Sequence, residues 1–112
     1  MSDCIFCKII NEEIPCQKVY EDTDILAFND INPAAETHVL VIPKQHISSL
    51  NDLNDSHEEI MGKLMISIPK VAKQLGLKGF KTIINTGKEG GQVVFHIHAH
   101  ILGGTIKKSM PV

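Results

Sequence analysis

Three histidines alternate with other residues in the run Phe95 to Gly104, near the end of the chain. Histidine suits proton transfer, nucleophilic attack and metal ligation near neutral pH. Because side chains of a β-strand point alternately to opposite faces, the three imidazoles are predicted to share one face. A lone histidine is most often a satisfied polar residue at a core edge, but three at strict alternation indicate chemistry. The imidazole face would carry His96, His98 and His100, and the buried face Phe95, Ile97, Ala99 and Ile101.

A second group that could do chemistry is the pair Cys4 and Cys7, which has the spacing of a zinc knuckle. Two cysteines are half of a tetrahedral site, and a buried cysteine is often only a small apolar residue. Two histidines would complete a Cys₂His₂ shell. One ion shared by all three alternating histidines is disfavoured, because residues four apart on a strand lie about 13 Å apart. Cys16 has no such partner and is predicted to be a plain packed residue.

Length and composition fit one globular domain over residues 1–112. The hydrophobic share of 43% and the charged share of 21% are ordinary, and the net charge of −2 gives no reason to expect nucleic acid or an anionic membrane as a partner. No apolar run approaches the roughly 20 residues that span a bilayer, and the start lacks a signal-peptide pattern. An odd count of three cysteines speaks against a disulfide framework. We expect a cytoplasmic protein with reduced thiols.

The apolar pattern predicts an α+β fold with a mainly antiparallel sheet, one longer helix and a short N-terminal helix. The continuous run Val39 to Ile42 is typical of a strand covered on both faces. Shorter apolar runs bounded by turn-forming residues predict the other strands. Besides the histidine strand, the predicted strands cover residues 18–21, 25–29, 37–43 and 81–86.

Local signals place the ends of the two predicted helices. Ser2 or Asp3 would cap the short N-terminal helix. A capping box over residues 56–59 would start the longer one. Pro69 lies inside its apolar pattern, so we expect a kink or an early break there, and Gly76 is the expected stop.

The run His96 to Leu102 resembles the signature of the histidine triad (HIT) family, in which two apolar residues follow three alternating histidines. Residues 4–14, 25–47 and 85–104 also resemble the Hint-like branch of that family, so the resemblance covers most of the chain. It implies a HIT-like fold whose sheet continues across a homodimer. It also implies a nucleotide-binding hydrolase that cleaves the P–N or a related bond at the α-phosphate of a purine nucleoside monophosphate derivative, as an adenosine 5′-monophosphoramidase does.

The resemblance also implies roles by position. His98 would be the nucleophile that becomes transiently nucleotidylated, while His100 and His38 would support the phosphate and the imidazole. Asp30 would bind ribose hydroxyls, although from the residues alone a turn role is the simpler interpretation. The base pocket would be lined by Ile5, Phe6, Ile9 and Phe28, and the phosphate region would include Asn85, Gly91, Gln92 and Val93.

A structural zinc is the further implication of the resemblance, with no part in the reaction itself. His46 and His96 would join Cys4 and Cys7 around the ion, which leaves His98 free for chemistry.

Val93 departs from the family pattern, because serine is common at this position in the Hint-like branch and valine removes the hydroxyl donor. We therefore expect a different substrate preference or rate, with the basic reaction kept. Two alternatives stay open. One is a nucleotide-binding scaffold with little turnover, and the other is a dinucleoside polyphosphate hydrolase of the same family. Gly103 and Gly104 after the triad resemble the Hint-like branch more closely than the branches with such other substrates.

Overall fold

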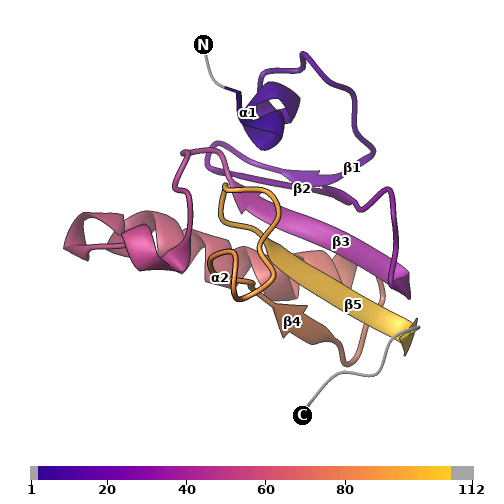
Figure 1. Cartoon of the computed structure of the whole chain (residues 1–112). Helices are drawn as coiled ribbons and strands as arrows, with labels where there is room; N and C mark the ends of the chain where they lie inside the picture. Colours follow the sequence, from indigo (N-terminus) through magenta and orange to yellow (C-terminus); the bar gives the residue numbers. More distant parts are fainter. Residues whose placement is uncertain (1–2, 107–112) are drawn as a thin grey trace.

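The structure is a computed structural model that describes residues 3–106, with side chains described as far as Gly104. Five strands form one antiparallel sheet in the order β1-β2-β3-β5-β4 (Figure 1). This arrangement confirms the predicted α+β fold. The elements are α1 (Ile5–Ile10), β1 (Lys18–Glu21), β2 (Ile25–Asn29), β3 (Ala35–Pro43), the 3-10 helices η1 (Leu50–Asp52) and η2 (Asp55–His57), α2 (Glu58–Gln74), β4 (Lys81–Ile83) and β5 (Ala99–Ile106).

The central strand β3 carries the apolar run that the sequence singles out, and all four of its residues are buried. Val39 and Val41 belong to a core cluster with α2, whereas Leu40 and Ile42 belong to a cluster with α1. The strand is thus covered on both faces, as predicted. It begins at Ala35, two residues earlier than expected.

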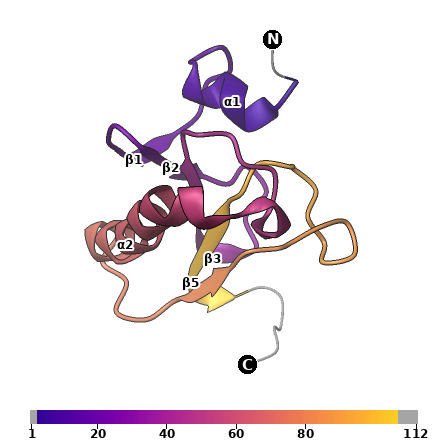
Figure 2. The same ribbon diagram turned by 90° about the vertical axis from the view of Figure 1, so that its left-hand side faces the viewer.

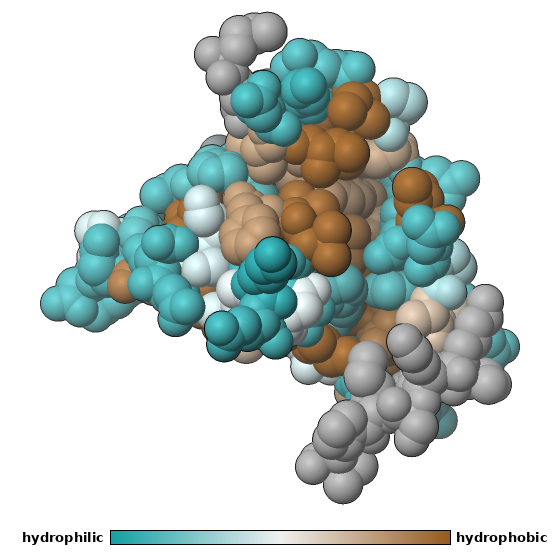
Figure 3. All heavy atoms as spheres, viewed as in Figure 1, coloured by the Kyte–Doolittle hydropathy of each residue, from teal (hydrophilic) through white to brown (hydrophobic). Residues whose placement is uncertain are grey.

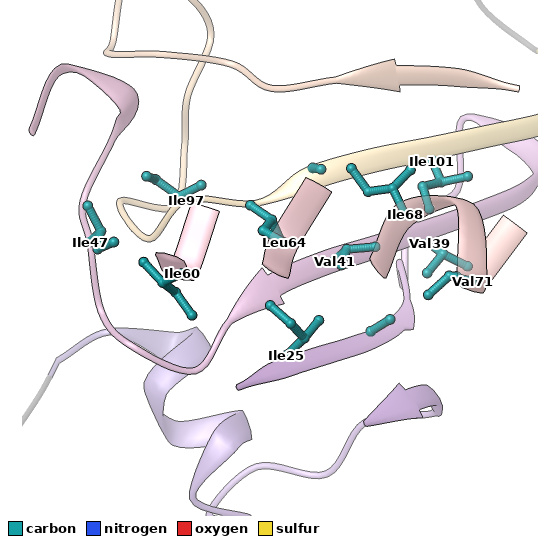
Figure 4. Close-up of a cluster of buried hydrophobic side chains, with 12 residues drawn as sticks. Ile25, Val39, Val41, Ile47, Ile60, Leu64, Ile68, Val71, Ile97 and Ile101 are labelled. Atoms are coloured by element: carbon teal, nitrogen blue, oxygen red, sulfur yellow. The ribbon is translucent and has the colours of Figure 1, made fainter. Parts of the chain in front are cut away.

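Each helix covers its own face of the sheet (Figures 1 and 2). The α2 side is aliphatic, and Figure 4 shows Ile60, Leu64, Ile68 and Val71 of the helix facing residues of β2, β3 and β5. The α1 side is smaller and aromatic. Its buried members are Phe6, Ile9, Leu26, Phe28, Leu40 and Ile42. Among the described residues, no helix is long and apolar enough to cross a membrane.

Both helices start at caps other than the predicted ones. The cap of α1 is Cys4, whose Sγ accepts the Cys7 N–H (3.4 Å), and not Asp3; Ser2 lies outside the described residues. The capping box belongs to Asn54 and not to Ser56, because His57 Nδ1 accepts the Asn54 N–H (3.0 Å). A 3-10 turn therefore precedes α2, which begins at Glu58.

The longer helix runs through Pro69, so the predicted break there is wrong. Proline leaves the carbonyl four residues earlier without its helical donor. That residue, Met65, and Pro69 itself are both exposed, so the missing hydrogen bond lies on the solvent-facing side of the helix and not in the core. The helix ends just before Gly76, the expected stop, whose φ of 74° supports a Schellman turn in which the Leu77 N–H donates to the Ala72 carbonyl (2.9 Å).

The histidine strand is shorter than predicted, because β5 begins at Ala99. Its pairing with β3 starts at Val41 opposite Ala99, and β3 ends two residues later. Residues 84–98 instead form a loop, which also limits β4 to Lys81–Ile83 instead of residues 81–86. Ile97, Ala99 and Ile101 enter the α2-side core as predicted, but Phe95 is 47% exposed and its predicted burial is wrong.

Candidate functional site: a cysteine–histidine cluster beside a histidine chain

Five of the six histidines lie close together, with ring-to-ring contacts of 5.0 to 5.1 Å. On β3 and β5, His38 pairs with Leu102 and His100 with Leu40, so the two histidines are diagonal neighbours. Phe6 of α1 contacts the rings of both His96 and His98 edge-on, with centroid distances of 5.9 and 5.1 Å. The rings of His98 and His100 lie 5.0 Å apart. The three alternating imidazoles therefore share one face, as their spacing predicts.

Four side chains from three separate segments converge beside α1 to form what we term the metal cluster. Cys4 Sγ and Cys7 Sγ lie 3.4 and 3.6 Å from His96 Nδ1, and Cys7 Sγ lies 3.4 Å from His46 Nδ1. The two Nδ1 atoms are 3.2 Å apart. Zinc bonds of about 2.3 Å to sulfur and 2.0–2.1 Å to nitrogen place tetrahedral ligands roughly 3.3–3.6 Å apart. The four residues therefore fit a tetrahedral Zn²⁺ site.

A backbone carbonyl sets the tautomer of His96. Its Nε2 lies 2.7 Å from the Pro43 oxygen, which can only accept, so Nε2 carries the hydrogen. The lone pair is then on Nδ1 and faces the two sulfur atoms. Burial lowers the pKa of His96, whose side chain is fully buried, and keeps the imidazole neutral. A metal-binding histidine has this same arrangement, with its other nitrogen bonded to a carbonyl.

The second group, termed the histidine chain, consists of His38, His100 and His98. The Ala34 N–H donates to His38 Nδ1 (2.9 Å), so the hydrogen of neutral His38 is on Nε2. That Nε2–H donates to His100 Nδ1 (2.9 Å), which places the hydrogen of His100 on its own Nε2. This Nε2 is buried and has no hydrogen-bond partner among the described residues. A buried donor without an acceptor costs about 1–3 kcal/mol, so an acceptor on a ligand is the natural partner.

His98 has the opposite tautomer. Its Nδ1 lies 2.8 Å from the His96 carbonyl oxygen, so Nδ1 carries the hydrogen and Nε2 the lone pair. The residue is 7% exposed and its ring lies against Phe6 and His100. A nucleophilic nitrogen and a hydrogen-bond donor therefore occur on adjacent rings.

Burial keeps the histidine chain neutral. It lowers the pKa of His38 and His98, and it lowers the pKa of His100 to about 4. The Asp30 carboxylate opposes this effect at all three rings. At neutral pH the chain therefore offers a free lone pair on His98 and a fixed donor on His100.

The predicted base-pocket residues divide into buried and exposed ones. Phe6, Ile9 and Phe28 are buried in the α1-side cluster, where the Phe6 and Phe28 rings meet edge-to-face at 5.6 Å. Ile5, on the same helix, is 45% exposed. Asp30 adopts the turn role, since its Oδ1 accepts the Asn32 N–H (2.8 Å).

The predicted phosphate-region residues lie on the loop before β5. Gln92 is buried, and its side chain is committed to the protein: Oε1 accepts the Gly87 N–H (2.8 Å), and Nε2 donates to the carbonyls of Ser48 (2.7 Å) and Val94 (3.0 Å). Asn85 is half-buried and Gly91 is exposed with a φ of 86°. Gly90 has no room for a Cβ, which would overlap the Thr86 carbonyl oxygen.

Val93 is 87% exposed at the rim of a cavity of about 500 Å³ that opens beside the metal cluster. Figure 3 shows apolar side chains gathered at the surface of this region, between α1 and the loop before β5. His98 is not among the residues that line the cavity. They are Asp3, Cys4, Ile5, His46, Ser48, Val93, Val94 and Phe95.

Sequence reasoning missed the groups that set the tautomers. They are the carbonyls of Pro43 and His96 and the N–H of Ala34. Backbone groups are the same at every residue, so no signal in the sequence could have found them. Of the side chains, Cys16 packs against the α1-side cluster, as predicted.

The HIT domain family matches residues 11–106, which is most of the chain. The chain belongs to the HIT family. This HIT chain is 56% identical over 104 residues to protein HitA of Neisseria gonorrhoeae, covering 92% of this chain and 97% of HitA. It is 45% identical to the purine nucleoside phosphoramidase of Escherichia coli K12, over 91% of this chain and 87% of that protein.

Solved structures of HIT proteins agree with the fold. A histidine triad protein from Clostridium difficile superposes with a TM-score of 0.90 at 50% identity, covering 100% of this chain and 96% of the other. A HIT family hydrolase from Legionella pneumophila gives a TM-score of 0.88 at 48% identity, covering 91% and 93%. The resemblance drawn from the histidine run is confirmed.

Proposed function

We propose that this HIT chain hydrolyses the P–N, or a related, bond at the α-phosphate of a purine nucleoside monophosphate derivative through a nucleotidyl-histidine intermediate. The observation that carries the proposal is the adjacency of His98, with its lone pair on Nε2, to the unpartnered Nε2–H of His100. The phosphoramidase name of the Escherichia coli relative supports the same reaction class.

In the first step, the lone pair of His98 Nε2 forms a bond to phosphorus while the P–N bond breaks. The nitrogen leaves with the bonding electron pair and takes up one proton from solvent. His98 becomes a nucleotidylated imidazolium, whose Nδ1–H remains bonded to the His96 carbonyl. Phosphoryl transfer requires mainly positioning and donors to the equatorial oxygens, and His100 Nε2–H supplies such a donor.

In the second step, water attacks the same phosphorus and the bond to His98 Nε2 breaks. The imidazole recovers its lone pair, the products are a nucleoside monophosphate and one proton, and the site returns to its starting state. Covalent catalysis of this kind divides one difficult displacement into two easier ones. In this scheme His38 acts only through His100, by holding its Nδ1 as an acceptor.

The metal cluster has a structural role in this proposal. Cys4, Cys7, His46 and His96 would hold Zn²⁺, which supplies no chemistry to the reaction. These ligands link α1 to the loop after β3 and to the segment that contains His98. A cytoplasmic location would keep both thiols reduced and able to bind the metal.

The nucleotide would lie under α1, with Ile5, Phe6, Ile9 and Phe28 toward the base and Asp30 near the ribose. Backbone groups of Gly91 and Gln92, with Asn85 and Val93, would approach the phosphate region.

We further propose that residues 1–112 form a single HIT-like domain that acts as a homodimer. Strand β4 is an edge of the sheet, and Phe80 beside it and Met65 and Ile66 on α2 are exposed apolar residues. Sedimentation at low concentration tests this assembly, and a monomer at micromolar concentration contradicts it.

The central test uses adenosine 5′-phosphoramidate. After a quench within one turnover, mass spectrometry is expected to find one nucleotide on His98. His98→Ala is expected to lose the adduct and at least about 10³-fold in kcat, since the nucleophile is gone. His57→Ala is the matched control, because His57 belongs to neither cluster and its ring accepts the Asn54 N–H. Equal rates for His98→Ala and the wild type contradict the mechanism.

Other outcomes separate the alternatives. Tight nucleotide binding with no turnover on phosphoramidates, acyl-nucleotides or dinucleotides favours a scaffold. Faster cleavage of dinucleoside polyphosphates than of phosphoramidates favours a dinucleoside polyphosphate hydrolase.

A further inference from the structure

Asp30 lies immediately after β2, opposite His38 of β3. Its backbone N–H donates to the His38 carbonyl (2.9 Å), which extends the β2–β3 pairing by one residue beyond Asn29 and Val39. Residues paired in this way carry their side chains on the same face of the sheet. The carboxylate therefore reaches the histidine chain from the β2 side.

One carboxylate oxygen of Asp30 is hydrogen-bonded and the other has an electrostatic contact with His38. Oδ1 accepts the Asn32 N–H (2.8 Å), and Oδ2 lies 3.4 Å from His38 Nε2. The side chains of Asp30 and His38 are only 18% and 7% exposed. The turn fixes one oxygen, and the other oxygen then faces the nitrogen whose hydrogen is donated to His100.

We propose that Asp30 is a positioning residue of the histidine chain: its negative charge beside His38 Nε2 favours the hydrogen on that nitrogen, from which it is donated to His100 Nδ1. His100 then keeps its own hydrogen on Nε2, where the phosphate would bind. This role differs from ribose binding, and where it concerns turnover it rests on the proposed function.

A metal ion is the competing explanation for Asp30, His38 and His100, whose ligand atoms also lie within 4.8 Å of one another. The 2.9 Å between the two nitrogens is a hydrogen-bond distance, and two nitrogen ligands of a tetrahedral ion lie about 3.3 Å apart. His38 Nδ1 is also occupied by the Ala34 N–H. Hydrogen bonding and not metal ligation accounts for this group.

The charge of Asp30 supports the same role. Burial lowers the pKa of His38, and the Asp30 charge partly offsets that effect; at His100 the same charge opposes burial and the neighbouring His98 and His38. The carboxylate therefore makes His100 Nδ1 a better acceptor for the His38 hydrogen.

Asparagine cannot replace Asp30, because it has one acceptor oxygen where the aspartate uses two. If that oxygen accepts the Asn32 N–H, the amide NH₂ faces the His38 Nε2–H, and two donors meet. Asp30→Ser is a second variant that keeps one oxygen for the turn and removes the group facing His38. Asp24→Asn is the matched control, since it removes the same charge from an ion pair with Lys63 outside the histidine chain.

The kinetic test crosses these variants with two substrates, adenosine 5′-phosphoramidate and its 2′,3′-dideoxy analogue. The positioning role predicts that Asp30→Asn and Asp30→Ser lower kcat by roughly tenfold on both substrates, since a small displacement of a catalytic group costs up to about 100-fold. Asp24→Asn is expected to stay within twofold of the wild type. A loss that is confined to KM, and that vanishes on the dideoxy analogue, overturns the proposal in favour of ribose binding alone.

A second readout needs no turnover. Long-range ¹H–¹⁵N spectra of the free wild-type protein at pH 7 are expected to show His38 and His100 protonated on Nε2 only. Asp30→Asn and Asp30→Ser are expected to give mixed tautomers of both rings. Unchanged tautomers in both variants overturn the proposal. If the wild type cleaves no nucleotide, the proposed function fails, and these spectra still decide the role of Asp30.

Discussion

The metal cluster and the histidine chain use the same kind of side chain, the imidazole, in opposite ways, although His96 of the first and His98 of the second are only two residues apart. In the metal cluster, the Nδ1 atoms of His46 and His96 lie 3.2 Å apart and converge with two sulfurs on a common centre. In the histidine chain, His38 and His100 are 2.9 Å apart and are joined by one hydrogen that points in one direction. The first arrangement suits a cation, and the second presents a donor to an anion.

Backbone partners account for this difference. His96 and His98 each donate to a carbonyl, but His96 does so through Nε2 and His98 through Nδ1. Their lone pairs are consequently on opposite nitrogens: that of His96 faces the cysteines, and that of His98 is the one that would attack phosphorus in the proposed mechanism. The comparison indicates that histidine can serve either purpose, and that the backbone carbonyl bonded to each ring decides which nitrogen keeps the lone pair.

Loss of the proposed zinc ion is expected to have the largest effect on stability. Cys7→Ser should abolish zinc binding, measured by elemental analysis. Because a ligand at 100 times its Kd stabilises the folded state by about 2.7 kcal/mol, the free energy of unfolding should fall by at least that amount. Cys16→Ser, outside the cluster, is the control and should keep the metal. Wild type purified without chelator that holds no zinc would refute the metal cluster.

Gln92 connects the two regions, since its side chain joins the loop before His96 to Ser48, near His46. Gln92→Leu leaves three backbone groups without partners, at a cost of about 2–3 kcal/mol in urea unfolding. Gln74→Leu loses a single exposed bond to the Val19 carbonyl and should cost less than about 1 kcal/mol. Equal losses in the two variants would show that Gln92 does not hold the loop.

Acid should destabilise the histidine chain in a defined window. The folded pKa of His100 is about 4, below the unfolded value of 6.5, so the unfolded state binds more protons between these pH values. The contribution of neutral His100 to the free energy of unfolding is therefore fully present above pH 6.5 and declines as the pH falls toward 4. His100→Gln should show a smaller decline in urea midpoint over that range. An equal decline would assign the acid sensitivity to other groups.

Val93→Ser is expected to have the smallest effect. The side chain is 87% exposed, so the free energy of unfolding should change by less than about 0.5 kcal/mol. The added hydroxyl should change kcat/KM by roughly two- to tenfold, with a different factor for each leaving group. A uniform factor across leaving groups would show that Val93 does not contact them.

The fold was largely predictable because its apolar patterns are strong. The four-residue apolar run of β3 indicates a strand covered on both faces, and the apolar spacing of α2 indicates a helix with one buried side. Element ends were less predictable, since they depend on partners: β5 starts where β3 can pair with it, and Asn54 caps ahead of Ser56 because His57 returns a hydrogen bond.

For the site, residue types gave the alternating imidazoles and the cysteine pair, and the family resemblance added His38, His46 and Asp30. The sequence could not reveal which nitrogen of each ring holds its hydrogen, because carbonyl and amide groups decide that. It also could not reveal that the Gln92 side chain is hydrogen-bonded to the backbone of the protein, since that depends on where Ser48 and Val94 lie.

The tautomers of the histidines test the account most directly. Long-range ¹H–¹⁵N spectra of the zinc-loaded wild type at neutral pH should show His98 protonated on Nδ1 and His38, His96 and His100 protonated on Nε2. A hydrogen on His98 Nε2, or an imidazolium at His98, would remove the nucleophilic lone pair and contradict the account.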